Sequence, residues 1–63
     1  MSWAQYEVWS VDEDGHEELI DTTNSLKEAK KLAEESLQDD IVECIIYREE
    51  EGELEEVEVV VKE

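Results

Sequence analysis

Length, composition and charge limit what this chain can do. It has 63 residues and a formal net charge of −16, from 21 acidic and 5 basic residues, and it contains one cysteine. A chain this short makes a single domain, residues 1–63, whose thin core leaves no room for a catalytic cleft of the usual size. One cysteine excludes an internal disulfide, and the strong negative charge argues against nucleic acid and anionic membranes as partners.

The N-terminal third of the chain has the pattern of a β-hairpin. Residues 3–11, WAQYEVWSV, are rich in aromatic and β-branched side chains and predict a strand. Asp12–Gly15 predicts a turn, because glycine suits the left-handed position that closes a type I turn at a bulge. Residues 17–22 then predict a short second strand.

Residues 25–38, SLKEAKKLAEESLQ, predict the one helix. At about 100° per residue, one stripe collects Leu26, Ala29, Leu32, Ala33, Ser36 and Leu37. Ser25 followed by Glu28 predicts a capping box, in which each side chain bonds the backbone N–H of the other residue. The C-terminal end lacks a glycine cap and carries Asp39 and Asp40, which the helix dipole disfavours.

The rest of the chain predicts a second hairpin. Residues 41–49, IVECIIYRE, and 54–62, LEEVEVVVK, predict two strands. Residues 50–52 predict the turn between them, again a type I turn closed by glycine at a bulge. Two hairpins joined by a helix predict an α+β fold of ββαββ type, a four-stranded, mainly antiparallel sheet with the helix packed on one face. Strand orders 2-1-3-4 and 2-1-4-3 both remain open, and we favour the first, which is wholly antiparallel.

Strict alternation along the strands assigns their side chains to two faces. The face under the helix is predicted to hold Tyr6, Val8, Val42, Cys44, Ile46, Val57, Val59 and Val61, with Leu19 or Ile20. The open face is predicted to hold Trp9, Val11, Ile45, Tyr47 and Val60, fringed by Glu7, Glu43, Glu56 and Glu58. Aromatic and apolar groups inside a polar rim are typical of a binding or dimer surface, and packing across strands is the alternative.

The first turn has the spacing of a calcium loop over part of its length. Oxygen ligands and a glycine fall at the required places on Ser10, Asp12, Asp14, Gly15, Glu18 and Asp21. The pattern fails where serine begins it, where an aspartate replaces the bidentate glutamate, and where strands replace the flanking helices. We therefore expect a solvated hairpin tip and no metal.

The remaining reactive side chains do not form a catalytic set. His16 is the only histidine and lies in a turn, and Cys44 lies mid-strand on the inward face, where it acts as a small hydrophobe. With neither a histidine placed to activate the thiol nor a second cysteine, we expect no enzymatic activity and no cofactor.

Acidic residues concentrate in residues 12–18 and 49–58. On a regular strand, Glu56 and Glu58 would stand about 6.7 Å apart in a row on one face. In charge and size the chain is similar to the acidic DNA-mimic inhibitors of phages and bacteria, a resemblance that implies binding to a basic groove. We expect a non-enzymatic acidic binding module that engages a basic protein surface. Its steering carboxylates would be Glu49, Glu50, Glu51, Glu53, Glu55, Glu56 and Glu58, with Trp9 and Tyr47 as anchors.

Two other interpretations stay open. The open face could join two copies, so the chain is expected to be a monomer or a weak homodimer. The absence of proline and phenylalanine and the agreement of local signals with one fold also suit a designed domain without a biochemical function. With no apolar run of about 18 residues and no signal-peptide pattern, a cytoplasmic location is expected.

Overall fold

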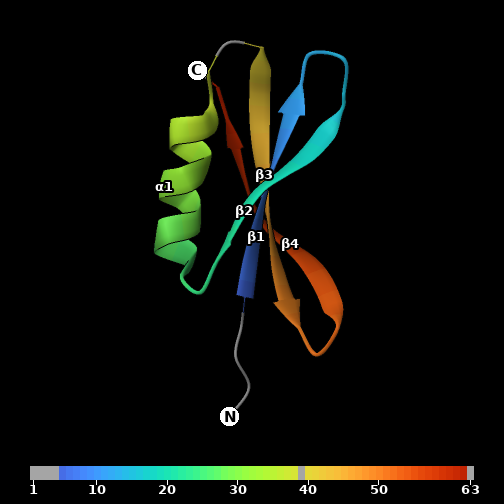
Figure 1. Ribbon diagram of the computed structural model, residues 1–63, viewed down its shortest axis with the longest axis vertical. Coiled ribbons are helices and arrows are strands. Elements are labelled where there is room, and N and C mark those ends of the chain that lie inside the picture. Colours follow the sequence, from blue (N-terminus) through green and yellow to red (C-terminus); the bar gives the residue numbers. More distant parts are fainter. Residues whose placement is uncertain (1–4, 39, 63) are drawn as a thin grey trace.

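The computed structural model describes residues 5–38 and 40–62, which form a four-stranded sheet with one helix against it (Figure 1). The elements are β1 (Gln5–Asp12), β2 (Glu17–Thr23), α1 (Leu26–Ser36), β3 (Ile41–Glu50) and β4 (Glu53–Val61). The strand order is β2-β1-β3-β4, and every neighbouring pair is antiparallel. The ββαββ prediction and the favoured strand order are therefore confirmed. Trp3, in the first predicted strand, and Asp39, after the predicted helix, lie outside the described residues.

Helix α1 buries its small side chains against the centre of the sheet. Ala29 and Ala33 are fully buried and pack in one cluster with Val8, Cys44 and Ile46. Leu26, Leu32 and Leu37 pack around this cluster, which confirms the predicted helical stripe. Burial raises the pKa of the Cys44 thiol, with a smaller contribution from the charge of Glu43, so the thiol stays neutral as a core side chain does.

The helix begins without the predicted capping box. Ser25 is the N-cap residue and its carbonyl accepts a hydrogen bond from the Ala29 N–H at 2.9 Å, but its side chain makes no capping bond. Thr23, at the end of β2, instead connects the two residues of the predicted capping box. Its hydroxyl accepts from the Ser25 N–H at 3.3 Å and donates to the Glu28 carboxylate at 2.9 Å. The capping-box prediction is wrong because the sheet holds a better-placed hydroxyl two residues earlier.

A side chain replaces the missing glycine at the end of the helix. Gln38 donates from Nε2 to the carbonyl of Glu35 at 2.5 Å, and its own carbonyl accepts from the Ile41 N–H at 3.0 Å. One of the last helical carbonyls thereby has a hydrogen-bond donor, and the Gln38 carbonyl is hydrogen-bonded to the first residue of β3.

The two hairpin turns differ. In the first, the Gly15 N–H bonds the Asp12 carbonyl and the Asp12 N–H bonds the His16 carbonyl, both at 3.1 Å, with Gly15 at φ 86°. This is the predicted type I turn closed by a glycine bulge. In the second, only Glu51 and Gly52 join the strands, at φ 53° and 82°, which is the pattern of a type I′ turn. The prediction of two identical turns is therefore wrong.

Three bulges break the alternation on which the predicted faces rest. Ile20, Val42 and Val57 are the extra residues, each lying between two successive cross-strand pairs. An extra residue reverses the facing of every side chain beyond it.

The largest consequence of the bulges is in β4. Ile46 pairs with Glu58 and Tyr47 with Glu56, so Val57 is skipped. Val59 and Val61 consequently lie on the open face, opposite Ile45 and Glu43, whereas Val60 and Glu58 lie on the helix side. The predicted faces of Val59, Val60, Val61 and Glu58 are all wrong for this reason.

The other two bulges have smaller effects. Beside the β3 bulge, Val42 is 39% exposed, and Ile41 packs against the core in its place, which corrects the predicted inward position of Val42. In β2, Leu19 lies opposite Trp9 on the open face and Ile20 remains 38% exposed, so neither is a core residue.

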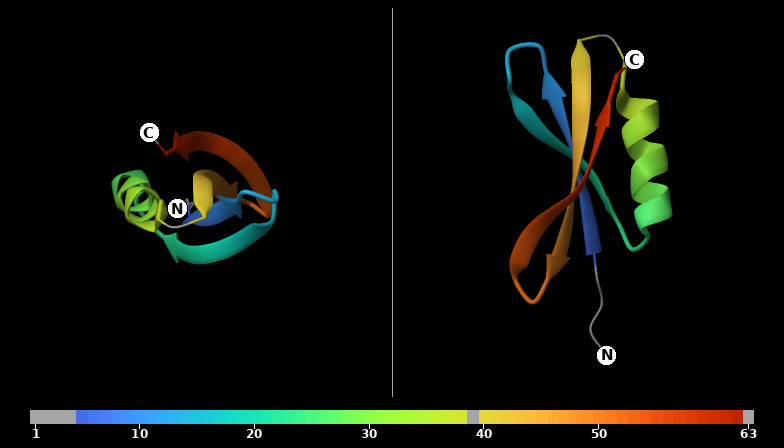
Figure 2. Two further views of the ribbon diagram at one scale, coloured as in Figure 1. Left: turned by 90° about the horizontal axis from the view of Figure 1, so that it is seen from above. Right: turned by 180° about the vertical axis from the view of Figure 1, so that it is seen from behind.

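The sheet is strongly twisted. Both hairpin ends lie on the side of the molecule away from α1 (Figure 2). Within the described residues, no helix combines the length and apolarity that crossing a membrane requires.

Candidate functional site on the open face

The open face, defined as the sheet surface opposite α1, carries an apolar row across all four strands. Residues that are directly paired share a face, and pairing aligns Leu19, Trp9, Ile45 and Val59. One neighbouring row holds Thr22, Glu7, Tyr47 and Glu56, and the other holds Glu17, Val11, Glu43 and Val61. Beyond Tyr47, Glu49 pairs with Leu54. An apolar band thus crosses the sheet with carboxylates along both sides.

Much of this band is open to solvent. Leu19 and Val59, at the two ends of the apolar row, are 44% and 38% exposed. Leu54 and Val61, in the neighbouring rows, are 53% and 58% exposed. Packing across strands, the alternative interpretation, accounts for the buried Val11 and the half-buried aromatic pair, but it leaves these aliphatic side chains uncovered. The open face therefore combines a partly buried aromatic centre with exposed aliphatic side chains on both edge strands.

Trp9 and Tyr47 form a fixed aromatic pair at the centre of the face. Their ring centroids lie 6.5 Å apart, and the ring planes meet at 89°. The Trp9 indole Nε1 donates to Glu7 Oε1 at 3.0 Å. Burial, and then the charges of Glu17 and Glu56, raise the pKa of Tyr47, so the phenol remains protonated.

The aromatic pair borders a shallow hollow between the two hairpins. Trp9, Tyr47, Glu17 and Leu54 line this hollow, which has a volume of about 320 Å³. Glu17 belongs to the start of β2 and Leu54 to the start of β4, the two corners that Figure 2 shows on the side away from the helix. The twist of the sheet therefore brings residues from opposite edges to one site.

The predicted steering carboxylates are divided between the two faces. Glu49 and Glu56 lie on the open face, whereas Glu50, Glu53, Glu55 and Glu58 lie on the helix side and Glu51 lies in the turn. Glu58 makes an ion pair with Lys30 at 3.5 Å, and Glu50 pairs with Arg48. The predicted row of Glu56 and Glu58 on one face is wrong, because the bulge at Val57 places them on opposite faces.

The five basic residues lie away from the open face. Three of them, Lys27, Lys30 and Lys31, are on α1. Arg48 lies opposite Tyr6 on the helix side, and Lys62 lies beside Leu37 at the end of the helix. Among residues 5–38 and 40–62, the ionised groups on the open face are therefore all carboxylates.

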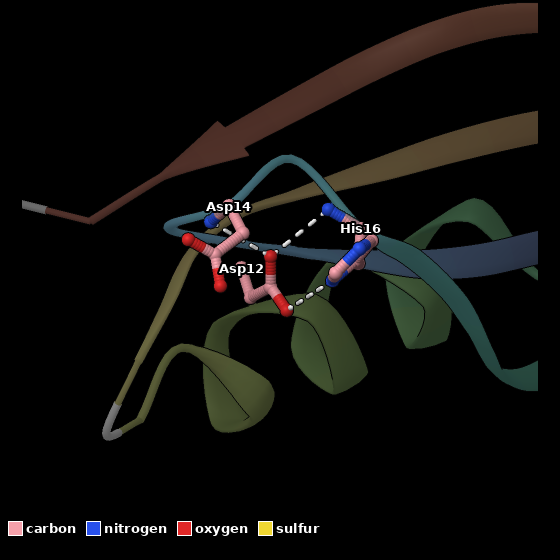
Figure 3. Close-up of side chains that lie close together, drawn as sticks. All are labelled: Asp12, Asp14 and His16. Carbon is pink, nitrogen blue, oxygen red and sulfur yellow. Dashed lines mark hydrogen bonds and ion pairs between the residues drawn. The ribbon is translucent and has the colours of Figure 1, made fainter.

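Asp12, Asp14 and His16 form a second cluster, in the first turn (Figure 3). Asp12 Oδ1 accepts from the N–H groups of Asp14 and His16, both at 2.9 Å, and Oδ2 lies 3.4 Å from His16 Nδ1. The hydrogen bond from the His16 backbone is the main reason that the pKa of Asp12 is lowered. This carboxylate closes the turn. Of the other predicted calcium-type ligands, Asp21 bonds the Thr22 N–H at 2.8 Å and lies along β2.

Comparison of the chain with protein-family models, with curated proteins and with solved structures finds no match.

The predicted position of Trp9 and Tyr47 on the open face is confirmed, whereas much of their surroundings could not be predicted. Leu19, Leu54, Val59 and Glu17 were not assigned to the open face, because their positions depend on bulges and on the twist of the sheet. One signal was available in the sequence: Val59, Val60 and Val61 are consecutive, so an alternating strand cannot direct all three to one face.

Proposed function

We propose that the chain is a non-enzymatic binding module whose open face engages a basic protein surface. The observation that carries this proposal is the apolar row across four strands, bordered by carboxylates, with the basic residues placed elsewhere. The apolar row supplies contact area, and the carboxylates select the sign of charge on the partner.

Charge complementarity favours a basic partner over a second copy of this chain. Two copies joined through the open face would bring the same carboxylates, among them Glu43 and Glu56, toward one another across the contact. Like charges opposed at an interface weaken it, and a net charge of −16 adds long-range repulsion between copies. A partner with lysine or arginine around an apolar centre meets neither obstacle.

Imitation of a phosphate backbone has less support than direct contact through the open face. A mimic needs carboxylates in a regular row, and Glu56 and Glu58 lie on opposite faces. Glu58 and Glu50 are moreover engaged by Lys30 and Arg48.

The proposal is tested with three labelled 12-residue peptides: alternating lysine and leucine, alternating lysine and serine, and alternating glutamate and leucine. Fluorescence anisotropy is measured between 20 and 300 mM salt. The lysine–leucine peptide is expected to bind at least about tenfold tighter than the lysine–serine peptide, and binding should weaken as salt rises. The acidic peptide should not bind.

Two charge-reversal variants supply the matched control. Glu49→Lys with Glu56→Lys changes the open face, and Glu34→Lys with Glu35→Lys changes the exposed side of α1 by the same charge. The open-face pair is expected to lose about tenfold more affinity than the helix pair. Equal losses would overturn the proposal, because bulk charge would then explain the binding. Failure of the lysine–leucine peptide to bind would favour a domain without a biochemical function, and a dimer mass in light scattering would favour the second copy.

A further inference from the structure

We infer that the hollow between Trp9 and Tyr47 is a binding site for an alkylammonium group, the end of a lysine side chain of the basic partner. This inference rests on the proposed function and names the chemical group that the open face would hold at its centre.

The first argument is the geometry of the two rings. A cation is attracted to the face of an aromatic ring by the ring quadrupole, and sites for organic cations use rings set at an angle around the charge. The ring planes of Trp9 and Tyr47 are perpendicular, at 89°, and both rings line the same hollow. A group placed in the corner between them meets two aromatic walls.

The second argument is that a carboxylate holds the larger ring in place. The Trp9 indole N–H donates to Glu7 Oε1 at 3.0 Å. This bond fixes the indole ring before a ligand arrives, so little side-chain freedom is lost on binding. It also leaves the face of the indole ring richer in electrons, which strengthens attraction of a cation.

The third argument is the composition of the remaining lining. Glu17 contributes a negative charge at the wall of the hollow, and Glu56, directly opposite Tyr47 on β4, contributes another at its border. Leu54 contributes an apolar surface suited to the methylene stem of a lysine. The basic residues of the chain lie on or beside the helix side, so they do not compete for this hollow.

The test uses choline and its neutral carbon isostere, 3,3-dimethyl-1-butanol, which have nearly the same shape and differ in charge. Each is titrated into the isotopically labelled protein at constant ionic strength, and the Trp9 indole N–H signal is followed by NMR. Choline is expected to give a saturable shift with a dissociation constant on the order of 10 mM. The isostere is expected to bind at least about tenfold more weakly.

Three variants locate the site. Trp9→Leu is expected to abolish the choline effect, followed on the Leu54 methyl signals. Tyr47→Phe keeps the ring and should bind choline within about threefold of the unaltered protein. Val42→Ala changes an exposed side chain outside the hollow and should leave choline binding unchanged. If Trp9→Leu fails to fold, the comparison of choline with its isostere still decides the question in the unaltered protein.

The two proposals fail separately. Equal binding of choline and the isostere, or no saturable shift with choline beyond that with sodium chloride, overturns the cation site. Selective choline binding without binding of the lysine–leucine peptide supports the cation site and overturns the proposed protein partner. Replacing each lysine of that peptide in turn by norleucine should reveal one position whose loss weakens binding at least about fivefold. An even effect at all positions contradicts a single anchoring lysine.

Discussion

At the scale of single residues, Glu51 occupies an unfavourable backbone conformation. Its φ of 53° lies in the left-handed region, where a side chain other than that of glycine, asparagine or aspartate is disfavoured. The two-residue loop between β3 and β4 imposes this value, because the type I′ and II′ turns that match the flanking strands both need a positive φ at the first loop residue. The turn consequently carries strain that another residue could relieve.

Replacing Glu51 by asparagine should stabilise the fold. Asparagine tolerates the left-handed region, so we expect the free energy of unfolding in urea to rise by about 0.5–1 kcal/mol. Glu13→Asn, in the first turn, removes the same charge, and among the described non-glycine residues a positive φ occurs only at Glu51. An equal gain in both variants would show that charge relief, and not backbone strain, is responsible.

Asp12 should make stability depend on pH. Its carboxylate is stabilised by hydrogen bonds from the backbone of His16 and Asp14, and its pKa lies below the ordinary value of 3.8. Because the folded pKa is lowered, this contribution is fully present above the unfolded pKa and is lost as pH falls through the folded pKa.

The variant Asp12→Asn isolates that contribution. At pH 7 the unaltered protein should have the higher melting temperature, and the difference should shrink as pH falls from about 4 toward 2. Glu13→Gln serves as the control for loss of a carboxylate from the same turn. A difference for Asp12→Asn that stays constant down to pH 2 would contradict the role given to the ionised carboxylate.

At the scale of elements, the bulge at Val57 decides which alternate side chains of β4 face the core. Val60 packs against the buried cluster, whereas Val61 is 58% exposed on the open face. We expect Val60→Ala to lower the free energy of unfolding by about 1–2 kcal/mol and Val61→Ala by less than about 0.5 kcal/mol. Both changes carry the same loss of strand propensity, so the difference reports burial. A larger effect at Val61 would mean that β4 keeps the unbulged register.

The elements could be read from the sequence, and their faces only in part. Hydrophobic periodicity identified the helix, and glycine-containing turns separated the strands, because both are local signals. The faces of Val59, Val60 and Glu58 depend on the bulge at Val57. Its position is selected by packing of β4 against β3, and no turn or periodicity signal in the neighbouring sequence indicates it. The same holds for Thr23, whose capping role depends on where β2 ends relative to α1.

The candidate site also contains residues that could be placed from the sequence and residues that could not. Trp9 and Tyr47 could be placed on one face, because β1 and β3 pair without a bulge between these residues. Glu17 and Leu54 come from opposite edges of the sheet, and only the twist brings them to the aromatic pair.

At the scale of the whole molecule, the net charge of −16 opposes folding, because the folded chain holds its carboxylates closer together than the unfolded chain does. Added salt screens this repulsion. We expect the melting temperature to rise steadily between 20 and 500 mM sodium chloride. A flat or falling melting temperature would show that repulsion between carboxylates does not limit stability.

The central claim is that partners contact the sheet on the face opposite α1. The most direct measurement is methyl NMR of the protein during titration with the lysine–leucine peptide. The account predicts shifts at the methyl groups of Leu19, Ile45 and Val59 and unchanged signals from Ala29, Ala33 and Leu32. Shifts confined to the helix methyl groups, or spread evenly over both sets, would contradict it.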